Sequence, residues 1–292
     1  MRYKPLSETV GIELQDFDVT RAASLEEQAE LRALFCEHHL MLIRGQQPSE
    51  ADQDRFTEYF GPLSLMHDGR PAGYISNLGQ SGEELVVTGQ KELIWHADGT
   101  QGEHPGIGTS LLALIAEPGC ASTMFTSAVR AARELPPELR ARVEGRKAAH
   151  FRENYADRTD RRMRAKDVDP DAPAENYQCC DHDILYQLPH TDQKALFVNE
   201  LSTSHVVGMA DEEGEDLLQQ LFARIYDDKH VFTHHWQPGD LLIWDNIALQ
   251  HCRPSLGDAP RRLRRLSLDG WNTGDGVMDW FAAGTLRDRA EA

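Results

Sequence analysis

Cysteine is scarce in this chain and is not arranged as a metal or disulfide framework. There are five cysteines, an odd number, and no two have the CxxC spacing of a zinc ribbon. Disulfide-dependent secreted domains and zinc ribbons need paired or closely spaced cysteines. Neither class is therefore suggested, and scattered thiols of this kind suit a reducing cytoplasm.

Long apolar runs are also missing. No stretch approaches the roughly eighteen consecutive apolar residues that a membrane-spanning helix requires. The N-terminal sequence MRYKPLSETVGIEL contains no apolar signal core. We therefore expect a soluble, cytoplasmic protein without a membrane partner.

Basic residues are outnumbered by acidic ones. The chain has 48 acidic and 30 basic residues, which give a formal net charge of -18. A charge of this sign repels the phosphates of nucleic acids and the headgroups of anionic lipids. We expect the partner to be a small molecule, with no nucleic acid involved.

The sequence also lacks internal repeats and low-complexity tracts. Its 292 residues are compatible with one all-β domain, since barrels and sandwiches of this size commonly form a single core. We therefore expect one domain over residues 1–292.

The apolar pattern predicts mainly β structure with peripheral helices. Ser24 and Glu27 form a capping-box signature for a helix over residues 24–39, and Ser49 opens a second helix that ends before Gly61. A third helix is expected over residues 211–226. Short apolar or alternating runs typical of a β-sandwich or barrel cover residues 40–43, 74–78, 84–87, 93–96, 108–115, 122–126, 195–198, 241–244 and 263–268.

One segment does not follow this pattern. Residues 152–178 are rich in Arg, Asp, Ala and Pro, have almost no apolar periodicity, and are too long for an ordinary connection. We interpret this segment as a lid or a solvated insertion.

A histidine and a carboxylate lie two residues apart in LIWHADG. His96 and Asp98 follow an apolar run, and a two-residue spacing on a strand directs both side chains to the same face. Such a pair on its own is weak evidence of a site, because many His and Asp residues occur in the chain and a strand-end turn is the simpler explanation.

His251 ends the apolar run LLIWDNIALQH and is a candidate third ligand. If the two strands face each other in a barrel, the three side chains form a two-histidine, one-carboxylate set that leaves metal positions open. Open positions favour redox iron over a closed structural zinc site. Two alternatives remain, a zinc hydrolase with the same ligands and a non-catalytic jelly roll that binds a small molecule.

Several further motifs occur in a characteristic order. They are HHLMLIRGQ, FGPL, WHAD, STMFTS, KALFVNE, HHWQPGDLLIWDN, QH and RRLRRLSLDG, spread from about residue 5 to 272. By these motifs the chain resembles the TauD/TfdA family of Fe(II)/2-oxoglutarate-dependent dioxygenases. The resemblance implies a double-stranded β-helix (jelly-roll) core and makes His96, Asp98 and His251 the iron ligands.

The resemblance also implies a site for the distal carboxylate of 2-oxoglutarate. Arginine suits this task because its planar fork can donate two charge-assisted hydrogen bonds to a carboxylate. The family's two inward arginines are four residues apart, matching Arg261 and Arg265, whereas counting strictly from His251 selects Arg262. Thr123 in STMFTS matches the family threonine that contacts the same carboxylate.

On a strand, Arg261 and Arg265 share one face, and Arg262 and Arg264 share the other, where we expect a solvated strand edge. By resemblance, 2-oxoglutarate and O2 are converted to succinate and CO2 as a small organic substrate is oxidised, most simply by hydroxylation. His67 and Glu92 are candidate substrate contacts, but neither identifies a substrate. The resemblance is also compatible with a homo-oligomer.

Overall fold

The computed structural model describes residues 1–66, 69–78, 92–153, 161–169, 171, 173–254 and 259–269. The strand expected at residues 84–87 and the candidate contact His67 lie outside the described residues. No helix in the described ranges is long and apolar enough to cross a membrane.

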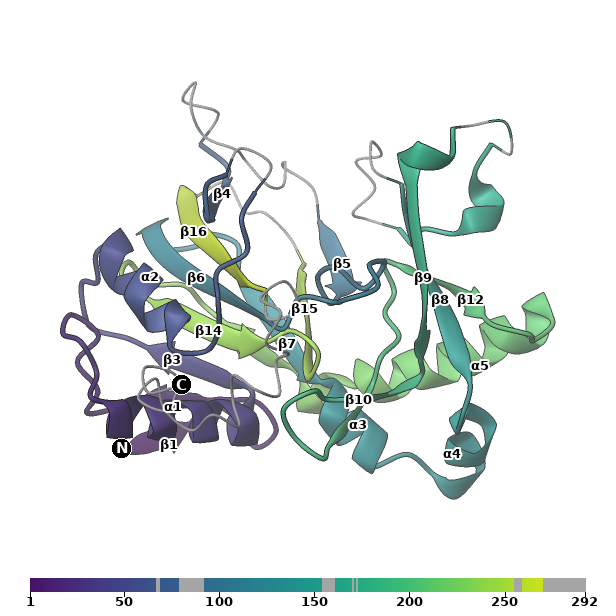
Figure 1. Cartoon of the computed structure of the whole chain (residues 1–292), viewed down its shortest axis with the longest axis horizontal. Helices are drawn as coiled ribbons and strands as arrows, with labels where there is room; N and C mark the ends of the chain where they lie inside the picture. Colours follow the sequence, from purple (N-terminus) through teal and green to yellow (C-terminus); the bar gives the residue numbers. More distant parts are fainter. Residues whose placement is uncertain are drawn as a thin grey trace, which may run out of the picture.

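Two β-sheets form the centre of the fold (Figure 1). The seven strands of the larger sheet are, in spatial order, β1 (Tyr3–Pro5), β2 (Ile12–Leu14), β3 (Leu40–Ile43), β14 (Leu241–Asp245), β6 (Gly108–Ala116), β16 (Arg261–Leu268) and β4 (Ala72–Ser76). The four strands of the smaller sheet are β13 (Phe232–His234), β7 (Thr123–Ser127), β15 (Leu249–Arg253) and β5 (Leu93–His96). All pairs in these sheets are antiparallel except β2 with β3.

The two sheets pack face to face around an apolar layer. Leu111, Leu242 and Trp244 of the larger sheet belong to the same buried cluster as Phe125 and Leu249 of the smaller sheet. In β14 they alternate with Leu241 and Ile243, which are buried in a different cluster, so this strand borders apolar layers on both of its faces. The predicted mainly β architecture is therefore confirmed.

Two helices cover the outer face of the larger sheet. α1 (Leu25–His38) and α2 (Glu50–Glu58) contribute Leu31, Phe35 and Phe56 to a second buried cluster. Both helices start at a capping box, with Ser24 and Ser49 as the N-caps. These boundaries confirm the two helices predicted from the sequence.

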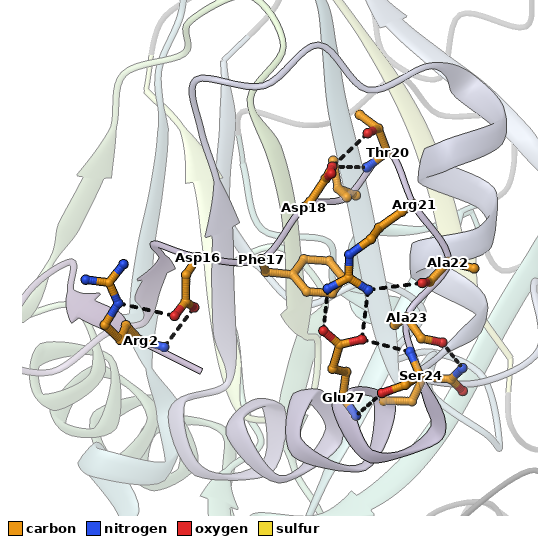
Figure 2. Close-up of polar contacts among 12 residues, drawn as sticks. Arg2, Asp16, Phe17, Asp18, Thr20, Arg21, Ala22, Ala23, Ser24 and Glu27 are labelled. Carbon is orange, nitrogen blue, oxygen red and sulfur yellow. Dashed lines mark hydrogen bonds and ion pairs between the residues drawn. The ribbon is translucent and has the colours of Figure 1, made fainter.

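The start of α1 is stabilised by a local polar network (Figure 2). The Ser24 hydroxyl accepts a hydrogen bond from the Glu27 backbone, and the Glu27 carboxylate accepts one from the Ser24 backbone. Arg21 also pairs with this carboxylate. The Arg21 contact and the Ser24 backbone lower the pKa of Glu27 to about 2. The Glu27 carboxylate thus accepts a hydrogen bond from a backbone N–H at the helix N-terminus and also forms an ion pair with Arg21.

A third layer packs beside the smaller sheet. It consists of the sheet β12 (Thr203–Val206), β8 (Lys147–Glu153) and β9 (Tyr177–Asp183), the hairpin β10 (Leu185–Gln187) and β11 (Lys194–Leu196), and the helices α3 (Ala128–Arg133), α4 (Pro137–Val143) and α5 (Asp211–Ile225). The short helices η1 (Ala165–Asp167), η2 (Ala174–Asn176) and η3 (Asp228–His230) complete the elements of the described chain. In Figure 1 the third layer lies on the right, with α5 along one side.

The segment 152–178 begins and ends in paired strands, which differs from the irregular segment that we expected. Arg152 pairs with Gln178, and Glu153 pairs with Tyr177, in the β8–β9 ladder. Most β9 residues are exposed on both faces, so the strand lacks the apolar alternation that sequence analysis depends on. The lid remains a hypothesis.

The run LLIWDNIALQH forms two strands, the first of which is the strand predicted over residues 241–244. β14 ends at Asp245, a turn follows, and β15 begins at Leu249 in the other sheet. Asp245 Oδ1 accepts hydrogen bonds from the backbone N–H groups of Ile247 and Ala248, both at 2.9 Å. This side chain fixes the turn and moves the chain from the larger sheet to the smaller one.

A fully buried histidine in β8 links stability to pH. Burial, followed by the neighbouring His182, lowers the pKa of His150 from 6.5 to about 3. The folded protein therefore keeps His150 neutral, while the unfolded chain takes up a proton below about pH 6.5. Stability from this group is present above pH 6.5 and is lost as the pH falls towards 3.

We expect His150→Asn to flatten the dependence of unfolding free energy on pH between 6.5 and 4.5. The slope should fall by up to about 1.4 kcal/mol per pH unit, because one proton-uptake difference is removed. Denaturant unfolding at several pH values measures it. The exposed His205 on β12 supplies the control His205→Asn, which should keep the parent slope. Equal slopes for the parent and His150→Asn would contradict the assignment.

Candidate metal centre

Three candidate ligands from two strands meet at one point. His96 ends β5, Asp98 follows it, and His251 lies on β15, directly opposite His96 in the antiparallel ladder. The two imidazole ring centroids are 4.1 Å apart. One ligand atom from each of the three side chains can be chosen so that all lie within 4.8 Å of one another. The spacing is suitable for a single metal ion.

Hydrogen bonding orients the first imidazole. His96 Nδ1 lies 2.9 Å from the carbonyl oxygen of Ile94. A carbonyl only accepts, so Nδ1 carries the proton and the Nε2 lone pair is left for a metal. His96 Nε2 is 3.6 Å from Asp98 Oδ1, on the side where the ligand atoms meet.

The second imidazole is packed between aromatic rings. The His251 ring lies 5.0 Å from Trp244 and 6.1 Å from Phe125, measured between centroids. Burial, followed by the nearby His96, lowers the pKa of His251 to about 3. His251 is therefore neutral at physiological pH, the form in which imidazole binds a metal.

The carboxylate of Asp98 is held in its charged form. Its Oδ2 atom accepts hydrogen bonds from Arg265 at 2.8 Å and from the Thr109 hydroxyl at 3.2 Å. Burial acts to raise the pKa of Asp98, but Arg265 and the two histidines hold it well below its ordinary value. The Oδ1 atom faces His96, so one oxygen is available for a metal while the other is anchored.

Asn246, in the turn between β14 and β15, holds the backbone of Asp98. Its Oδ1 accepts from the Asp98 N–H at 2.8 Å, and its Nδ2 donates to the carbonyl oxygens of Asp98 at 2.8 Å and Gly106 at 3.0 Å. Sequence analysis did not select this residue. The signal was a polar Asp-Asn pair interrupting an apolar run just before a candidate ligand.

The four arginines of β16 are divided between its two faces, as strand alternation predicts. Arg265 reaches Asp98, and Arg261 is buried on the same side. Arg261 Nη1 donates to the carbonyl oxygen of Ala121 at 2.7 Å. Burial, with a smaller contribution from Arg253, lowers the pKa of Arg261 to about 10.

The other two arginines are packed against protein, which corrects the expected solvated edge. Arg262 lies over the ring of Tyr74 at 4.6 Å, and Arg264 forms ion pairs with Glu50 and Asp54 of α2. β16 lies between β6 and β4 and is not an edge strand. Arg262, the alternative to Arg261, thus points away from the layer between the sheets.

Thr123 lies at the same end of the molecule as Arg261. It is buried at the start of β7, two residues after Ala121, whose carbonyl binds Arg261. Its hydroxyl oxygen accepts a hydrogen bond from Trp236 Nε1 at 3.0 Å. The hydroxyl proton can therefore be donated to an anion. The structure brings Thr123 and Arg261 together at one end. It also brings the three candidate ligands together, with Arg265 beside them.

The sequences of known proteins are consistent with this arrangement. A family model described as taurine catabolism dioxygenase TauD, TfdA family matches residues 2–267. Pentalenolactone F synthase of Streptomyces avermitilis is 27% identical over 248 residues, which cover 78% of this chain and 80% of the relative. The alpha-ketoglutarate-dependent 2,4-dichlorophenoxyacetate dioxygenase of Cupriavidus pinatubonensis is 26% identical, with 85% and 90% covered.

Solved structures share the fold. A taurine dioxygenase from Burkholderia xenovorans superposes with a TM-score of 0.73 at 24% identity, covering 91% of this chain and 90% of that one. AAD-2 in complex with Mn(II) and N-oxalylglycine gives a TM-score of 0.75 at 19% identity, covering 91% and 97%. These likenesses confirm the expected jelly-roll core. Because the family model spans nearly the whole sequence, the chain belongs to the TauD/TfdA family of 2-oxoglutarate-dependent dioxygenases.

Proposed function

We propose that this dioxygenase binds one Fe(II) through His96, Asp98 and His251 and, with 2-oxoglutarate and O2, oxidises a small organic molecule. The observation that carries the proposal is the convergence of two imidazoles and one carboxylate within 4.8 Å. This donor set occupies one side of a metal and leaves positions for other molecules, as in non-haem iron oxygenases.

The residues present fit Fe(II) in both charge and protonation. His251 is neutral and Asp98 is ionised. The Nδ1 atom of His96 is hydrogen bonded to the Ile94 carbonyl, so its Nε2 lone pair is available for a metal. Imidazole and carboxylate ligands of this kind suit a divalent first-row metal. Fe(II) in such a site, together with 2-oxoglutarate as co-reductant, supplies the activation of O2 needed to oxidise a substrate.

The protein's own contribution is to orient its ligands. The Ile94 carbonyl sets the tautomer of His96, and Arg265 and Thr109 hold the outer oxygen of Asp98. Asn246 fixes the backbone to which that carboxylate is attached. Partners of this kind reduce the conformational freedom that metal binding would otherwise have to restrict.

We infer that Thr123 and Arg261 bind the distal carboxylate of 2-oxoglutarate. Arg261 is buried between the sheets, whereas Arg262 stacks on Tyr74, so the geometry favours Arg261. A buried guanidinium and a hydroxyl donor can replace the water that a carboxylate loses. Arg265 remains a candidate cosubstrate contact through its place beside Asp98.

The substrate class is proposed only as a small organic molecule. The named relatives include enzymes for 2,4-dichlorophenoxyacetate and (S)-phenoxypropionate as well as a pentalenolactone F synthase. A substrate panel should therefore contain aryloxy acids, sulfonates, alkyl sulfates and amino acids. The single domain over residues 1–292, the homo-oligomer and the cytoplasmic location also remain proposals.

The direct test of function is succinate release from 2-oxoglutarate by protein supplied with Fe(II), ascorbate and O2. We expect Asp98→Ala to abolish metal-dependent succinate release, because it removes the only anionic member of the proposed ligand set. Asp181→Ala, at an exposed carboxylate in β9, is the control and should behave as the parent. Full turnover by Asp98→Ala would overturn the ligand assignment.

Substitution of Arg261 distinguishes the two cosubstrate arginines. We expect Arg261→Met to raise the 2-oxoglutarate concentration needed for half-maximal turnover by about ten- to a hundredfold, the effect of losing a charged hydrogen bond. Arg262→Met should change it little, since that side chain lies on Tyr74. Steady-state kinetics with varied 2-oxoglutarate gives both values, and the reverse order would assign the role to Arg262.

Asn246→Ala tests the support of Asp98. We expect the affinity for Mn(II), used as a redox-silent probe, to fall by about ten- to a hundredfold, the usual cost of losing a partner of a metal ligand. Calorimetric titration provides the affinity, with circular dichroism as the check on folding. A folded variant with the parent affinity would show that the Asn246 contacts do not position the site.

A further inference from the structure

Asp245 uses only one of its two carboxylate oxygens to fix the turn between β14 and β15. Oδ1 accepts the hydrogen bonds from the backbone N–H groups of Ile247 and Ala248. Oδ2 lies 2.8 Å from Nε2 of His190, and both of these side chains are completely shielded from water. The carboxylate thus links the turn to a histidine from a distant part of the chain.

The carboxylate of Asp245 is charged, although it is buried. Burial acts to raise its pKa, but His190, followed by His39, holds the pKa below its ordinary value. An ionised carboxylate can only accept, so Nε2 of His190 is the donor of the 2.8 Å contact. His190 therefore supplies the N–H that replaces water at the second oxygen of this carboxylate.

His190 is held in place by its own loop, which connects β10 and β11. Gln187 Nε2 donates to the carbonyl oxygens of Thr191 and Gln193, at 2.8 and 2.9 Å. On the other side, the ring of Phe35 in α1 lies 6.2 Å from the imidazole, measured between centroids. The imidazole thus reaches the carboxylate from a loop with little conformational freedom.

The turn connects this histidine with the metal centre. Asn246 directly follows Asp245, and its side chain binds the backbone N–H and carbonyl of Asp98. The Asp245 N–H donates to the carbonyl of His39 at 2.8 Å, and the Asn246 N–H donates to that of Ile107 at 3.1 Å. A rotation of Asp245 would be passed through one peptide unit to the Asn246 amide, and so to the backbone of the candidate ligand.

Stability alone does not account for such a pair. Taking an imidazole and a carboxylate out of water costs free energy that their attraction often does no more than balance. A buried pair of this kind is therefore a weak source of stability. What it supplies here is a fixed direction for the Asp245 side chain, and the next residue in the chain is the one that holds Asp98.

We propose that His190 is a positioning residue of the metal centre. Through Asp245 it keeps the turn in the conformation that directs Asn246 to the backbone of Asp98, and so it sets where the ligand carboxylate lies. The proposal rests on the proposed function, because it takes Asp98 as a metal ligand. It gives the loop between β10 and β11, which contributes no ligand, a share in metal affinity.

The test compares Mn(II) affinity in the parent and in three variants of His190, so that no turnover is required. His190→Leu removes the donor, His190→Asn places an N–H near the position of Nδ1, and His190→Gln places one near the position of Nε2. We expect Leu and Asn to weaken Mn(II) binding by about tenfold and Gln to stay within about threefold of the parent. Titration calorimetry provides the affinities, and circular dichroism checks folding. The two amide variants carry the comparison if His190→Leu fails to fold.

A double variant tests whether His190 acts through Asn246. Substitutions that affect one interaction do not add, whereas independent ones do. We expect His190→Asn combined with Asn246→Ala to bind Mn(II) within about twofold of Asn246→Ala alone, because the connection is already broken in the single variant.

Leu217→Ala separates metal affinity from stability. Leu217 is fully buried in α5, in the third layer, away from the turn. Its truncation should lower the denaturant midpoint of unfolding and leave the Mn(II) affinity of the parent unchanged. A loss of Mn(II) affinity in Leu217→Ala as large as that in His190→Asn would mean that affinity follows stability, and would overturn the positioning role.

The remaining outcomes are distinct. Parent affinity in a folded His190→Asn overturns the proposal, and so does a loss in His190→Gln as large as that in His190→Asn. Losses that multiply in the double variant overturn the connection through Asn246. A parent protein that does not bind Mn(II) instead overturns the proposed function itself. Selective recovery by glutamine, without additivity in the double variant, is the result that the structure predicts.

Discussion

The passage of the chain from one sheet to the other between β14 and β15 is the constraint on which the site depends. Asp245 fixes the turn, and Asn246 within it binds the backbone of Asp98. The same passage delivers His251 to the strand opposite His96. One short turn thus sets the relative positions of all three candidate ligands, although they are far apart in the sequence. Packing between the two sheets then keeps this geometry rigid.

The distribution of charge follows the same logic. The chain carries a formal net charge of -18, yet Arg261 is buried and Arg265 is largely shielded from water on the same face of β16. Removing cations from water is costly, so their presence there indicates anions that they are built to meet. For Arg265 the anion is Asp98, and for Arg261 we propose the distal carboxylate of the cosubstrate. An acidic surface and a cationic interior therefore coexist without conflict.

Much of the fold could be predicted from the sequence because short sequence patterns determine several of its helices and strands. The capping boxes at Ser24 and Ser49 located two helices, and the alternation within β16 correctly separated Arg261 from Arg262. The ladder of β8 with β9 could not be predicted, because β9 is largely exposed and carries no apolar pattern. Long-range pairing decides such strands, and a single sequence does not display it.

The candidate site shows the same division. HxD and a distant histidine are visible in a sequence, and the family resemblance selected among them. The contribution of Asn246 is visible only in three dimensions, since it binds the backbone of Asp98 from a turn far along the sequence. Residues that support a ligand are therefore harder to find than the ligand itself. The signal for Asn246 was a polar pair within an apolar run.

The central claim is that His96, Asp98 and His251 form one metal centre from which the cosubstrate extends towards Arg261. A crystal structure of the protein with Mn(II) and N-oxalylglycine, recorded with anomalous diffraction, tests it most directly. The account predicts one manganese peak at the three side chains and the distal carboxylate of the ligand at Arg261 and Thr123. Manganese bound at other residues, or a ligand directed away from Arg261, would contradict it.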